Sequence, residues 1–315
     1  MYRIGIDLGG TNIKAGIVNE DGKIVKSMST KTKKGVEPDV IIKDMVDLTK
    51  KLIDSCGITI KDILHIGIGV PGIANNETGV VVKAVNISFL DVPIREKMQK
   101  YFNVPIYLAN DANCAALAES LFGETKGVKN SLTVTIGTGI GGGIIINNEL
   151  YEGSNFAGGE LGHISLIMDG KQCSCGRKGC FEVYASATAL KNQAMEVVSK
   201  NKNTTIYNKV SGDINRVEAR VVFECAKRKD KVAEEIIDKY IKYLSAGLIT
   251  LINIFQPDVI AIGGGVSNAG EYFLNKVKNT IKNSNEMARE LEKRTVIKLA
   301  KLGNDAGIIG AAFLK

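Results

Sequence analysis

Residues 2–18 read YRIGIDLGGTNIKAGIV, and this stretch decides the fold that we expect for the chain. The run Tyr2–Leu8 alternates in hydrophobicity and stops at a glycine pair, after which Ile13–Val18 is apolar again. An Asp-Gly pair at 21–22 separates this run from residues 23–27. Alternation with a period of two indicates β-strands, and Asp-Gly is typical of a tight hairpin turn. The stretch therefore predicts three strands, with a glycine turn after the first and a hairpin after the second.

A second copy of this pattern begins 128 positions further on, where Gly137 corresponds to Gly9. The apolar run Ser131–Ile136 leads into a predicted glycine turn at 137–143, and the apolar residues 144–146 follow before an Asn-Asn pair. Repetition of strand, glycine turn, strand and hairpin indicates two related α/β halves. No low-complexity linker separates them, so we expect the domain boundaries at the ends of elements. The predicted lobes are residues 1–118 with 303–315, and residues 119–302.

Hydrophobic spacing predicts the remaining elements. Apolar residues at helical intervals indicate helices, and short apolar runs beside glycine or proline indicate buried strands. Asp111 directly precedes an alanine-rich run and is the expected N-cap of a helix. The polar segment 199–212 is expected to be a loop. The predicted helices are 37–56, 112–122, 232–255 and 305–314, and the predicted strands are 63–70, 104–109 and 259–262.

Composition excludes several classes of protein. The formal net charge is +7, but the lysines are dispersed and not interleaved with aromatic residues, so we expect no nucleic-acid partner. No segment has the length and apolarity of a membrane span, and the amino-terminal run is strand-like and not a basic export signal. We therefore expect a cytoplasmic protein that does not interact with membranes.

Three glycine-rich turns follow apolar runs, at residues 9–12, 137–143 and 263–267. Glycine leaves backbone N–H groups accessible to phosphate oxygens, although each turn alone is also explained as an ordinary tight turn. No P-loop motif occurs, and no dinucleotide fingerprint is followed by a helix, which argues against P-loop kinases and Rossmann dehydrogenases. The residues of these turns expected to bind a nucleotide are Gly9, Gly10, Thr11, Asn12, Gly137, Thr138, Gly139, Gly264 and Gly265.

Two charged residues flank the first glycine turn. Asp7 ends the first predicted strand, and a carboxylate there can hold a hydrated Mg²⁺ beside a polyphosphate. The alternative for Asp7 is a turn-capping aspartate. Lys14, on the far side of the turn, can meet a phosphate, and the alternative is a solvated hairpin lysine.

Three of the six cysteines, Cys173, Cys175 and Cys180, lie within eight residues, and His163 precedes the first by ten. Crowded thiols in a reducing compartment favour a metal over disulfides. Three thiolates and one imidazole complete a tetrahedral zinc set without a position for water, so this zinc is expected to be structural. Chance clustering of reduced cysteines is the alternative. His65, by contrast, lies in an apolar strand and is expected to be a core or edge histidine.

Four motifs together resemble one family of sugar kinases. DLGGTNIK at 7–14 resembles the first phosphate loop of kinases with the actin/hexokinase-type fold. AGGELGH at 157–163, followed by CSCGRKGCFE at 173–182, resembles the signature of the ROK family (repressors, open reading frames, kinases). LANDAN at 108–113 and GGGVS at 263–267 match two further motifs in the family's order. The resemblance runs from residue 4 to about residue 310, is greatest to bacterial glucokinases, and implies a two-lobed, ribonuclease H-like α/β fold.

The resemblance also implies the chemistry. ATP with Mg²⁺ would phosphorylate a hexose, converting glucose to glucose 6-phosphate at the start of glycolysis, and Asp111 would accept the proton of the attacking 6-hydroxyl. With one nitrogen of His163 on zinc, the other would face a sugar hydroxyl. A homodimer or higher homo-oligomer is usual in the family. The residues expected around the hexose are Asn86, Asn110, Asp111, Glu160, His163 and Glu182.

The substrate and the functional class stay open at this point. Residues 84–90 read AVNISFL, where the glucokinase pattern has a proline before the asparagine and a tryptophan after it, and the chain has no Trp. N-acetylmannosamine, fructose, allose and mannose are therefore alternative substrates, and polyphosphate is an alternative donor. The family also contains sugar-responsive repressors that carry a helix–turn–helix before the first phosphate loop. Only six residues precede Asp7, so we expect a kinase.

Overall fold

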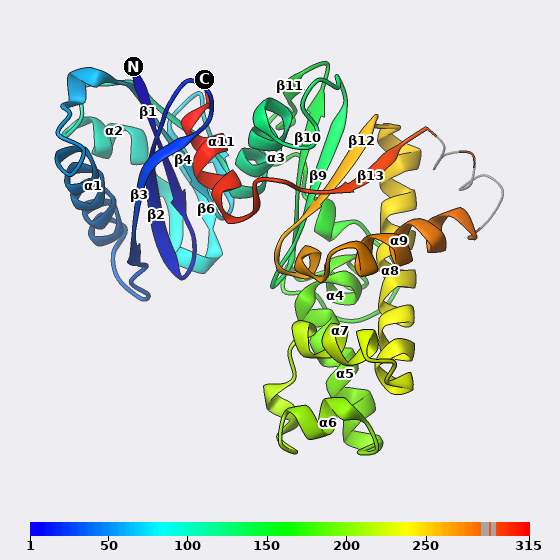
Figure 1. Cartoon of the computed structure of the whole chain (residues 1–315). Helices are drawn as coiled ribbons and strands as arrows, with labels where there is room; N and C mark the ends of the chain where they lie inside the picture. The colour runs from blue at the N-terminus through cyan, green and yellow to red at the C-terminus, as the bar shows by residue number, and fades with distance from the viewer. Residues whose placement is uncertain (285–289, 291–293) are drawn as a thin grey trace. The chain divides into compact units, whose positions relative to one another are not determined.

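The computed structural model describes residues 1–284, 290 and 294–315 (Figure 1). Packing contacts divide the chain into two units. The first unit comprises Met1–Thr133, Gly143–Gly159 and Lys301–Lys315, and the second comprises Val134–Gly142 and Glu160–Ala300. The lobe boundaries expected after residue 118 and before residue 303 stay a prediction, because packing contacts do not test independent folding.

The first unit is built on a five-stranded sheet of order β3-β2-β1-β4-β8. Strand β1 pairs antiparallel with β2, and β2 pairs antiparallel with β3, whereas β1, β4 and β8 run parallel. One face of the inner strands is apolar, and Ile4, Ile6, Ile66 and Ile68 on that face have no exposed surface. Because side chains alternate along a strand, the other face carries Gly5 and Gly67. The strands are β1 Tyr2–Leu8, β2 Asn12–Val18, β3 Ile24–Lys31, β4 Ile63–Val70 and β8 Ile106–Asn110.

Helices cover both faces of this sheet. Helix α1 packs on β2 and β3, while α11 packs on β1 and β4 and against α3, so that α1 and α11 lie on opposite faces (Figure 1). The contact with α11 is close, because a Cβ at Gly5 or Gly67 would overlap a backbone carbonyl oxygen of α11. The helices of the unit are α1 Pro38–Asp54, α2 Ile94–Gln99, α3 Asp111–Phe122 and α11 Ala306–Ala312.

A small antiparallel sheet, which the sequence did not predict, completes the first unit. Its strands are β5 Ile73–Asn75, β6 Val80–Ala84 and β7 Phe89–Val92, in that order. A 3-10 turn, Val85–Ile87, joins β6 to β7 and carries Asn86.

The second five-stranded sheet has the order β11-β10-β9-β12-β13, and the division into units falls within β9 and β10. Strands β12 and β13 are parallel, and β10 and β11 are antiparallel. These strands are β9 Ser131–Ile136, β10 Ile140–Ile146, β11 Glu149–Leu150, β12 Val259–Gly263 and β13 Val296–Leu299.

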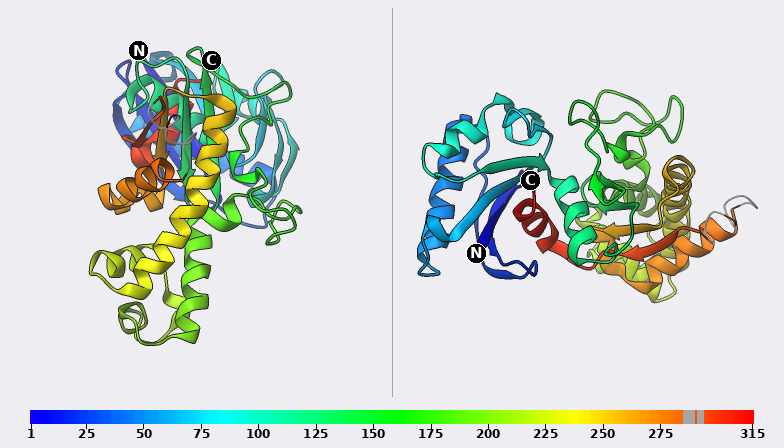
Figure 2. Two further views of the ribbon diagram at one scale, coloured as in Figure 1. Left: turned by 90° about the vertical axis from the view of Figure 1, so that its right-hand side faces the viewer. Right: turned by 90° about the horizontal axis from the view of Figure 1, so that it is seen from above.

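The second unit is otherwise helical around the 25-residue helix α8, Lys231–Phe255. Helix α8 packs against α4, α5, α7 and α9, and Figure 2 shows it running the length of the unit. It ends at Gln256, which takes a left-handed conformation (φ 39°) ahead of Pro257. Its neighbours are α4 Glu182–Ala185, α5 Ala187–Lys200, α6 Thr205–Lys209, α7 Ala219–Lys227 and α9 Glu271–Lys282.

Three sequence expectations about local structure are wrong. Only residues 137–139 of the predicted glycine turn 137–143 form a turn, and the next three glycines belong to β10. The predicted loop 199–212 contains α6. Helix α3 is capped by Asn110, while Asp111 is its first residue. Among the residues described, no helix is both long and apolar enough to cross a membrane.

Candidate functional site

The first glycine turn joins β1 to β2 and is held by two hydrogen bonds. The Gly9 N–H donates to the Asn12 carbonyl at 3.0 Å, and the Thr32 hydroxyl donates to the Gly9 carbonyl at 2.6 Å. A Cβ at Gly10 would lie 3.3 Å from the Asn86 Cβ, so the turn and Asn86 are neighbours. Asn86 is exposed beside it. The turn is therefore held in shape by its own backbone and by Thr32.

Asp7 and Lys14 face each other across this hairpin. They are register partners in β1 and β2, and the Lys14 Nζ lies 3.6 Å from an Asp7 carboxylate oxygen. Burial raises the pKa of Asp7, and the Lys14 charge and hydrogen bond oppose that rise. Gly307 at the start of α11 passes close by, because a Cβ there would lie 3.2 Å from the Asp7 Cγ. Lys14 is thus a partner of Asp7 and not simply a solvated lysine.

Asn110 and Asp111 occupy the junction between β8 and α3. The Asn110 side-chain oxygen accepts hydrogen bonds from the Ala112 N–H at 2.8 Å and from the Asn113 N–H at 3.3 Å, and its amide donates to the Gly72 carbonyl. The Asp111 carboxylate also accepts from the Ala112 N–H, at 2.8 Å. Both side chains are therefore oriented by the first turn of the helix.

The negative charges of three carboxylates of the first unit act on one buried thiol. The pKa of Cys114 is raised first by burial and then by the negative charges of Asp111, Asp7 and Glu152. Burial also raises the pKa of Glu152, and a hydrogen bond with the Asn113 side chain opposes that rise. Sequence reasoning missed Glu152, because it lies far along the chain from the other two carboxylates and in no recognised motif.

The second unit brings the four predicted metal ligands together. One ligand atom from each of His163, Cys173, Cys175 and Cys180 lies within 4.8 Å of all the others. The Cys175 and Cys180 sulfurs are 3.6 Å apart, and the Cys173 sulfur is 3.7 Å from the His163 Nδ1. Zinc bonds of about 2.3 Å to sulfur in a tetrahedron place neighbouring sulfurs roughly 3.8 Å apart. The cluster, which we call the Cys/His cluster, therefore fits a four-coordinate ion.

The surroundings of these thiols shift their pKa values in different directions. Burial raises the pKa of Cys173 to about 12, so a metal charge is needed to keep this group as a thiolate ligand at neutral pH. The backbone N–H of Arg177 lowers the pKa of Cys175. Gly176 and Gly179 take positive φ values of 90° and 77°, which lets the loop fold back on itself.

Two predicted sugar ligands lie directly beside the Cys/His cluster. The Glu182 carboxylate is 3.8 Å from the His163 Nδ1 and accepts a hydrogen bond from the Cys173 thiol at 3.3 Å. The Glu160 carboxylate is 4.0 Å from the His163 Nε2. His163 thus offers Nδ1 to the cluster and Nε2 to the side where Glu160 lies, as expected for a histidine shared between a metal and a ligand pocket.

The two remaining glycine turns meet at the ends of β9 and β12. Gly264 has a positive φ of 84°, and a Cβ there would overlap the backbone of Ile136, so this position requires glycine. Space beside Gly137 and Gly265 is open, with no atom within 4 Å of an added Cβ. A Cβ at Gly139 would overlap the Glu182 carboxylate, and the Ile140 N–H donates to that carboxylate at 3.3 Å. The turn at 137–139 therefore connects a predicted phosphate site to a predicted sugar ligand.

The sequence of the chain is similar to those of known proteins over nearly its whole length. The ROK family pattern matches residues 3–315. The chain is 36% identical to a glucokinase of Halalkalibacterium halodurans, over 99% of this chain and 94% of that protein. It is 33% identical to a xylose repressor of Caldicellulosiruptor bescii, over 98% of this chain and 76% of the repressor.

Solved structures agree with these sequence matches. The crystal structure of a ROK family glucokinase from Streptomyces griseus in complex with glucose and AMPPNP superimposes with a TM-score of 0.83 at 30% identity, covering 99% of this chain and 98% of that one. This similarity confirms the predicted α/β fold of the actin/hexokinase type. On the extent of these matches, the chain belongs to the ROK family.

Proposed function

We propose that the chain transfers the γ-phosphoryl group of ATP to a hydroxyl of a hexose, with glucose as the favoured acceptor. One observation carries the proposal. Because β1, β4 and β8 are parallel, their carboxyl ends lie at one edge of the sheet, where ligands bind in open α/β folds. Asp7 and Asp111 stand at that edge, beside the glycine turn at 9–12. The similarity to glucokinases supports the same reaction.

In this proposal Asp111 is the general base. The Ala112 N–H orients its carboxylate, which accepts the proton of the 6-hydroxyl as that oxygen attacks the γ-phosphorus. Phosphoryl transfer otherwise depends on positioning and on neutralising charge, with little covalent chemistry from the protein. Asp7 would hold Mg²⁺, which draws charge from the phosphates when bound. The half-buried setting of Asp7 and its pairing with Lys14 fit a carboxylate that exchanges one cationic partner for another.

The hexose is proposed to bind to Asn86, Asn110, Asp111, Glu160, His163 and Glu182. Carboxylates and amides suit this role, since each pairs with neighbouring hydroxyl groups. The Asn110 side chain already caps α3 and contacts Gly72, so it contributes a pre-oriented amide. We assign the nucleotide phosphates to the glycine turns at 9–12, 137–139 and 264–265, with ATP as the donor.

We propose that the Cys/His cluster holds a structural Zn²⁺. The ion would fix His163 through Nδ1 and so aim Nε2 at a sugar hydroxyl, next to Glu160. All four positions are filled by protein ligands, which suits a structural and not a catalytic ion. We also propose a homodimer, which light scattering of the purified protein tests directly.

A coupled assay of ADP release over a panel of hexoses tests the function. We expect glucose to give the highest kcat/KM. The alternative substrates are N-acetylmannosamine, fructose, allose and mannose. Asp111→Asn should lower turnover by roughly 10²–10⁴-fold while calorimetry shows that sugar and nucleotide still bind. Asp21→Asn, in the exposed hairpin turn, is the matched control and should be unaffected. Near wild-type turnover in Asp111→Asn would remove this residue from the base role.

A sugar-responsive repressor is the second candidate, because a xylose repressor matches nearly the whole chain. Both functions require a sugar site, so sugar binding does not separate them. An assay of phosphoryl transfer separates the kinase from the repressor, and a gel shift with sugar-operon promoter DNA also separates them. Sugar-dependent DNA binding without ADP release would favour the repressor.

A further inference from the structure

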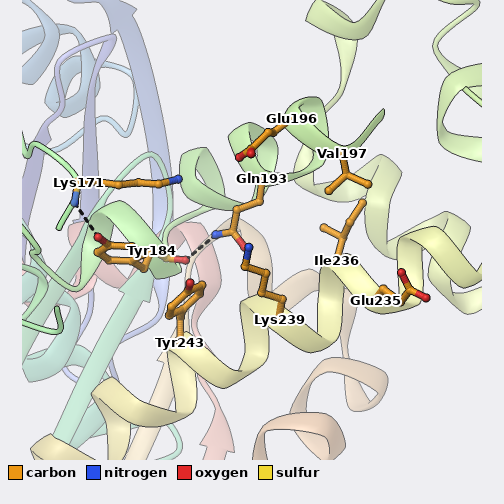
Figure 3. A pocket seen from close by; sticks show the side chains of 9 residues that line it. All are labelled: Lys171, Tyr184, Gln193, Glu196, Val197, Glu235, Ile236, Lys239 and Tyr243. Atoms are coloured by element: carbon orange, nitrogen blue, oxygen red, sulfur yellow. Dashed lines mark hydrogen bonds between the residues drawn. The ribbon is translucent and has the colours of Figure 1, made fainter. Parts of the chain in front are cut away.

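The second unit contains a cavity of about 300 Å³ that shares no residue with the sites described above. It lies between α5 and α8, and Figure 3 shows side chains from both helices and from α4 around it. Small-ligand pockets span roughly 300–1,000 Å³, so this volume suits a compact ligand. The lining residues that carry the argument are Lys171, Tyr184, Gln193, Glu196, Lys239 and Tyr243.

A buried hydrogen-bond acceptor belongs to a side chain that lines this cavity. Gln193 is 6% exposed, and its amide nitrogen donates to the Tyr184 carbonyl at 2.9 Å. Its carbonyl oxygen is buried and has no hydrogen-bond partner among the residues that the structure describes. Figure 3 shows this side chain turned towards Lys239 and Tyr243. A buried acceptor without a donor is unfavourable, so a ligand that donates a hydrogen bond is favoured here.

Charges of both signs stand at the rim. Lys171 and Lys239 are exposed, and in the described part of the chain neither forms an ion pair. Two ammonium groups that form no ion pair favour an anion that contacts both. Glu196 and Glu235 line the same rim and accept hydrogen bonds, which suits hydroxyl groups on the same ligand.

Two tyrosine rings supply an apolar wall. The Tyr184 and Tyr243 ring centroids are 5.0 Å apart, and the rings are tilted by 42°. Such a wall packs against the C–H face of a carbohydrate. The cavity thus offers acceptors for hydroxyl groups, cations for an anion and aromatic rings for a C–H face. These features together suit a ligand that carries hydroxyl groups, an anionic group and a carbon skeleton.

We propose that this cavity binds a small phosphorylated polyol, of the class to which a sugar phosphate belongs. The phosphate lies at Lys171 and Lys239, a hydroxyl donates to the Gln193 carbonyl oxygen, and the carbon skeleton packs on Tyr184 and Tyr243. The choice of a sugar phosphate as probe rests on the proposed kinase function, whose product is of this class.

Occupancy of the cavity is coupled to the candidate sugar residues through Tyr184. Tyr184 lies two residues after Glu182 on α4, and its hydroxyl accepts a hydrogen bond from the Lys171 N–H at 2.7 Å. Lys171 in turn lies two residues before Cys173 of the Cys/His cluster. A ligand that packs on Tyr184 therefore contacts the segment that carries Glu182 and the loop that carries the cluster. We expect it to change the KM for the sugar more than kcat.

Calorimetric titration with glucose 6-phosphate tests the site. The full-length protein is first saturated with glucose and AMPPNP, so that product cannot bind where the substrates do. We expect remaining binding of glucose 6-phosphate, reduced about tenfold or more in Lys239→Ala, because a charge-assisted contact is lost. Gln193→Leu should weaken binding similarly, whereas Lys242→Ala, an exposed lysine elsewhere on α8, should not. Inorganic phosphate alone and glucose alone should bind far more weakly than the sugar phosphate.

Two results would overturn the proposal: no binding of glucose 6-phosphate to the saturated protein, or equal binding by the wild type, Lys239→Ala and Gln193→Leu. Lys239 is exposed, so its variant is expected to fold and to keep basal turnover. If glucose and AMPPNP themselves fail to bind, it is the kinase proposal that fails. In that case the effect of Lys239→Ala on glucose 6-phosphate binding still decides the role of the cavity.

Discussion

Replacement of Glu119 by glutamine tests how the first unit holds its carboxyl-terminal segment. Glu119, on α3, has no exposed surface, and its carboxylate accepts three backbone hydrogen bonds. One oxygen accepts from the N–H groups of Lys301 and Leu302, at 2.9 and 2.8 Å, and the other accepts from the Glu124 N–H at 2.8 Å. The carboxylate therefore ties the segment before α11 to the end of α3.

The expected loss follows from these three bonds. Glutamine retains one carbonyl oxygen for Lys301 and Leu302, but its NH₂ group then faces the Glu124 N–H, so two donors oppose each other. Losing a hydrogen bond to a charged group and leaving a buried N–H unpaired costs about 2–5 kcal/mol. At about 2 °C per kcal/mol, the lower end for large domains, Tm falls by roughly 4–10 °C. Glu119→Ala removes all three acceptors and should lower Tm further.

Differential scanning calorimetry and urea unfolding measure this change. Glu149→Gln, which alters an exposed glutamate of the same unit, is the control and should leave Tm unchanged. If Glu119→Gln melts within about 1 °C of the wild type, the three backbone bonds do not stabilise this segment as reasoned.

Three further predictions concern the metal, a histidine and a glycine. Purified protein should contain one zinc per chain by elemental analysis, and chelation should lower Tm and sugar affinity together; normal values in a metal-free preparation would contradict this role. Burial lowers the pKa of His65, which contacts the Ala312 carbonyl at 2.8 Å. The unfolded chain then takes up a proton below about pH 6.5 more readily than the folded one. The wild type should therefore lose more stability than His65→Gln between about pH 7 and 5 in urea titrations. Gly5→Ala should lower stability by about 3 kcal/mol or more, because the new Cβ overlaps α11, and an unchanged urea midpoint would refute that contact.

Elements with long apolar runs could be predicted from the sequence. Strands β1, β4 and β9 have the predicted bounds, because each is a mostly apolar run that is followed directly by glycine or proline. Strands β5, β6 and β7 were missed, since three to five residues without strong alternation do not indicate a strand. The five-residue helix α6 was missed for the same reason.

Glycines misled the prediction of β10. They usually mark turns, but Gly142 and Gly143 lie in a strand at positions where other side chains leave no space for a Cβ. A Cβ at Gly142 would overlap Leu161, and one at Gly143 would overlap Ala116. Contacts of this kind depend on tertiary packing and leave no local pattern.

Site residues could be predicted where they lie in a local sequence motif and not where their partners are distant in sequence. The Cys/His cluster was predicted because its ligands lie close together in sequence at spacings typical of zinc. Glu119 and Glu152 were not predicted, because their partners come from distant segments or carry no motif. Asn110 was predicted as a sugar ligand and not as the cap of α3, since Asn and Asp are equally good caps and the sequence places them side by side.

The docking of α11 on β1 and β4 has a consequence for biosynthesis. The ribosome makes the strands of this sheet first and residues 160–300 next, and α11 emerges only after them. Until then, the sheet face on which Gly5 and Gly67 lie has no α11 to cover it. Strand alternation places Arg3, Asp7 and His65 on this face beside the glycines, so the nascent chain presents a glycine-rich, partly polar face until α11 docks. The apolar core on the opposite face is formed with α1 and does not wait for α11.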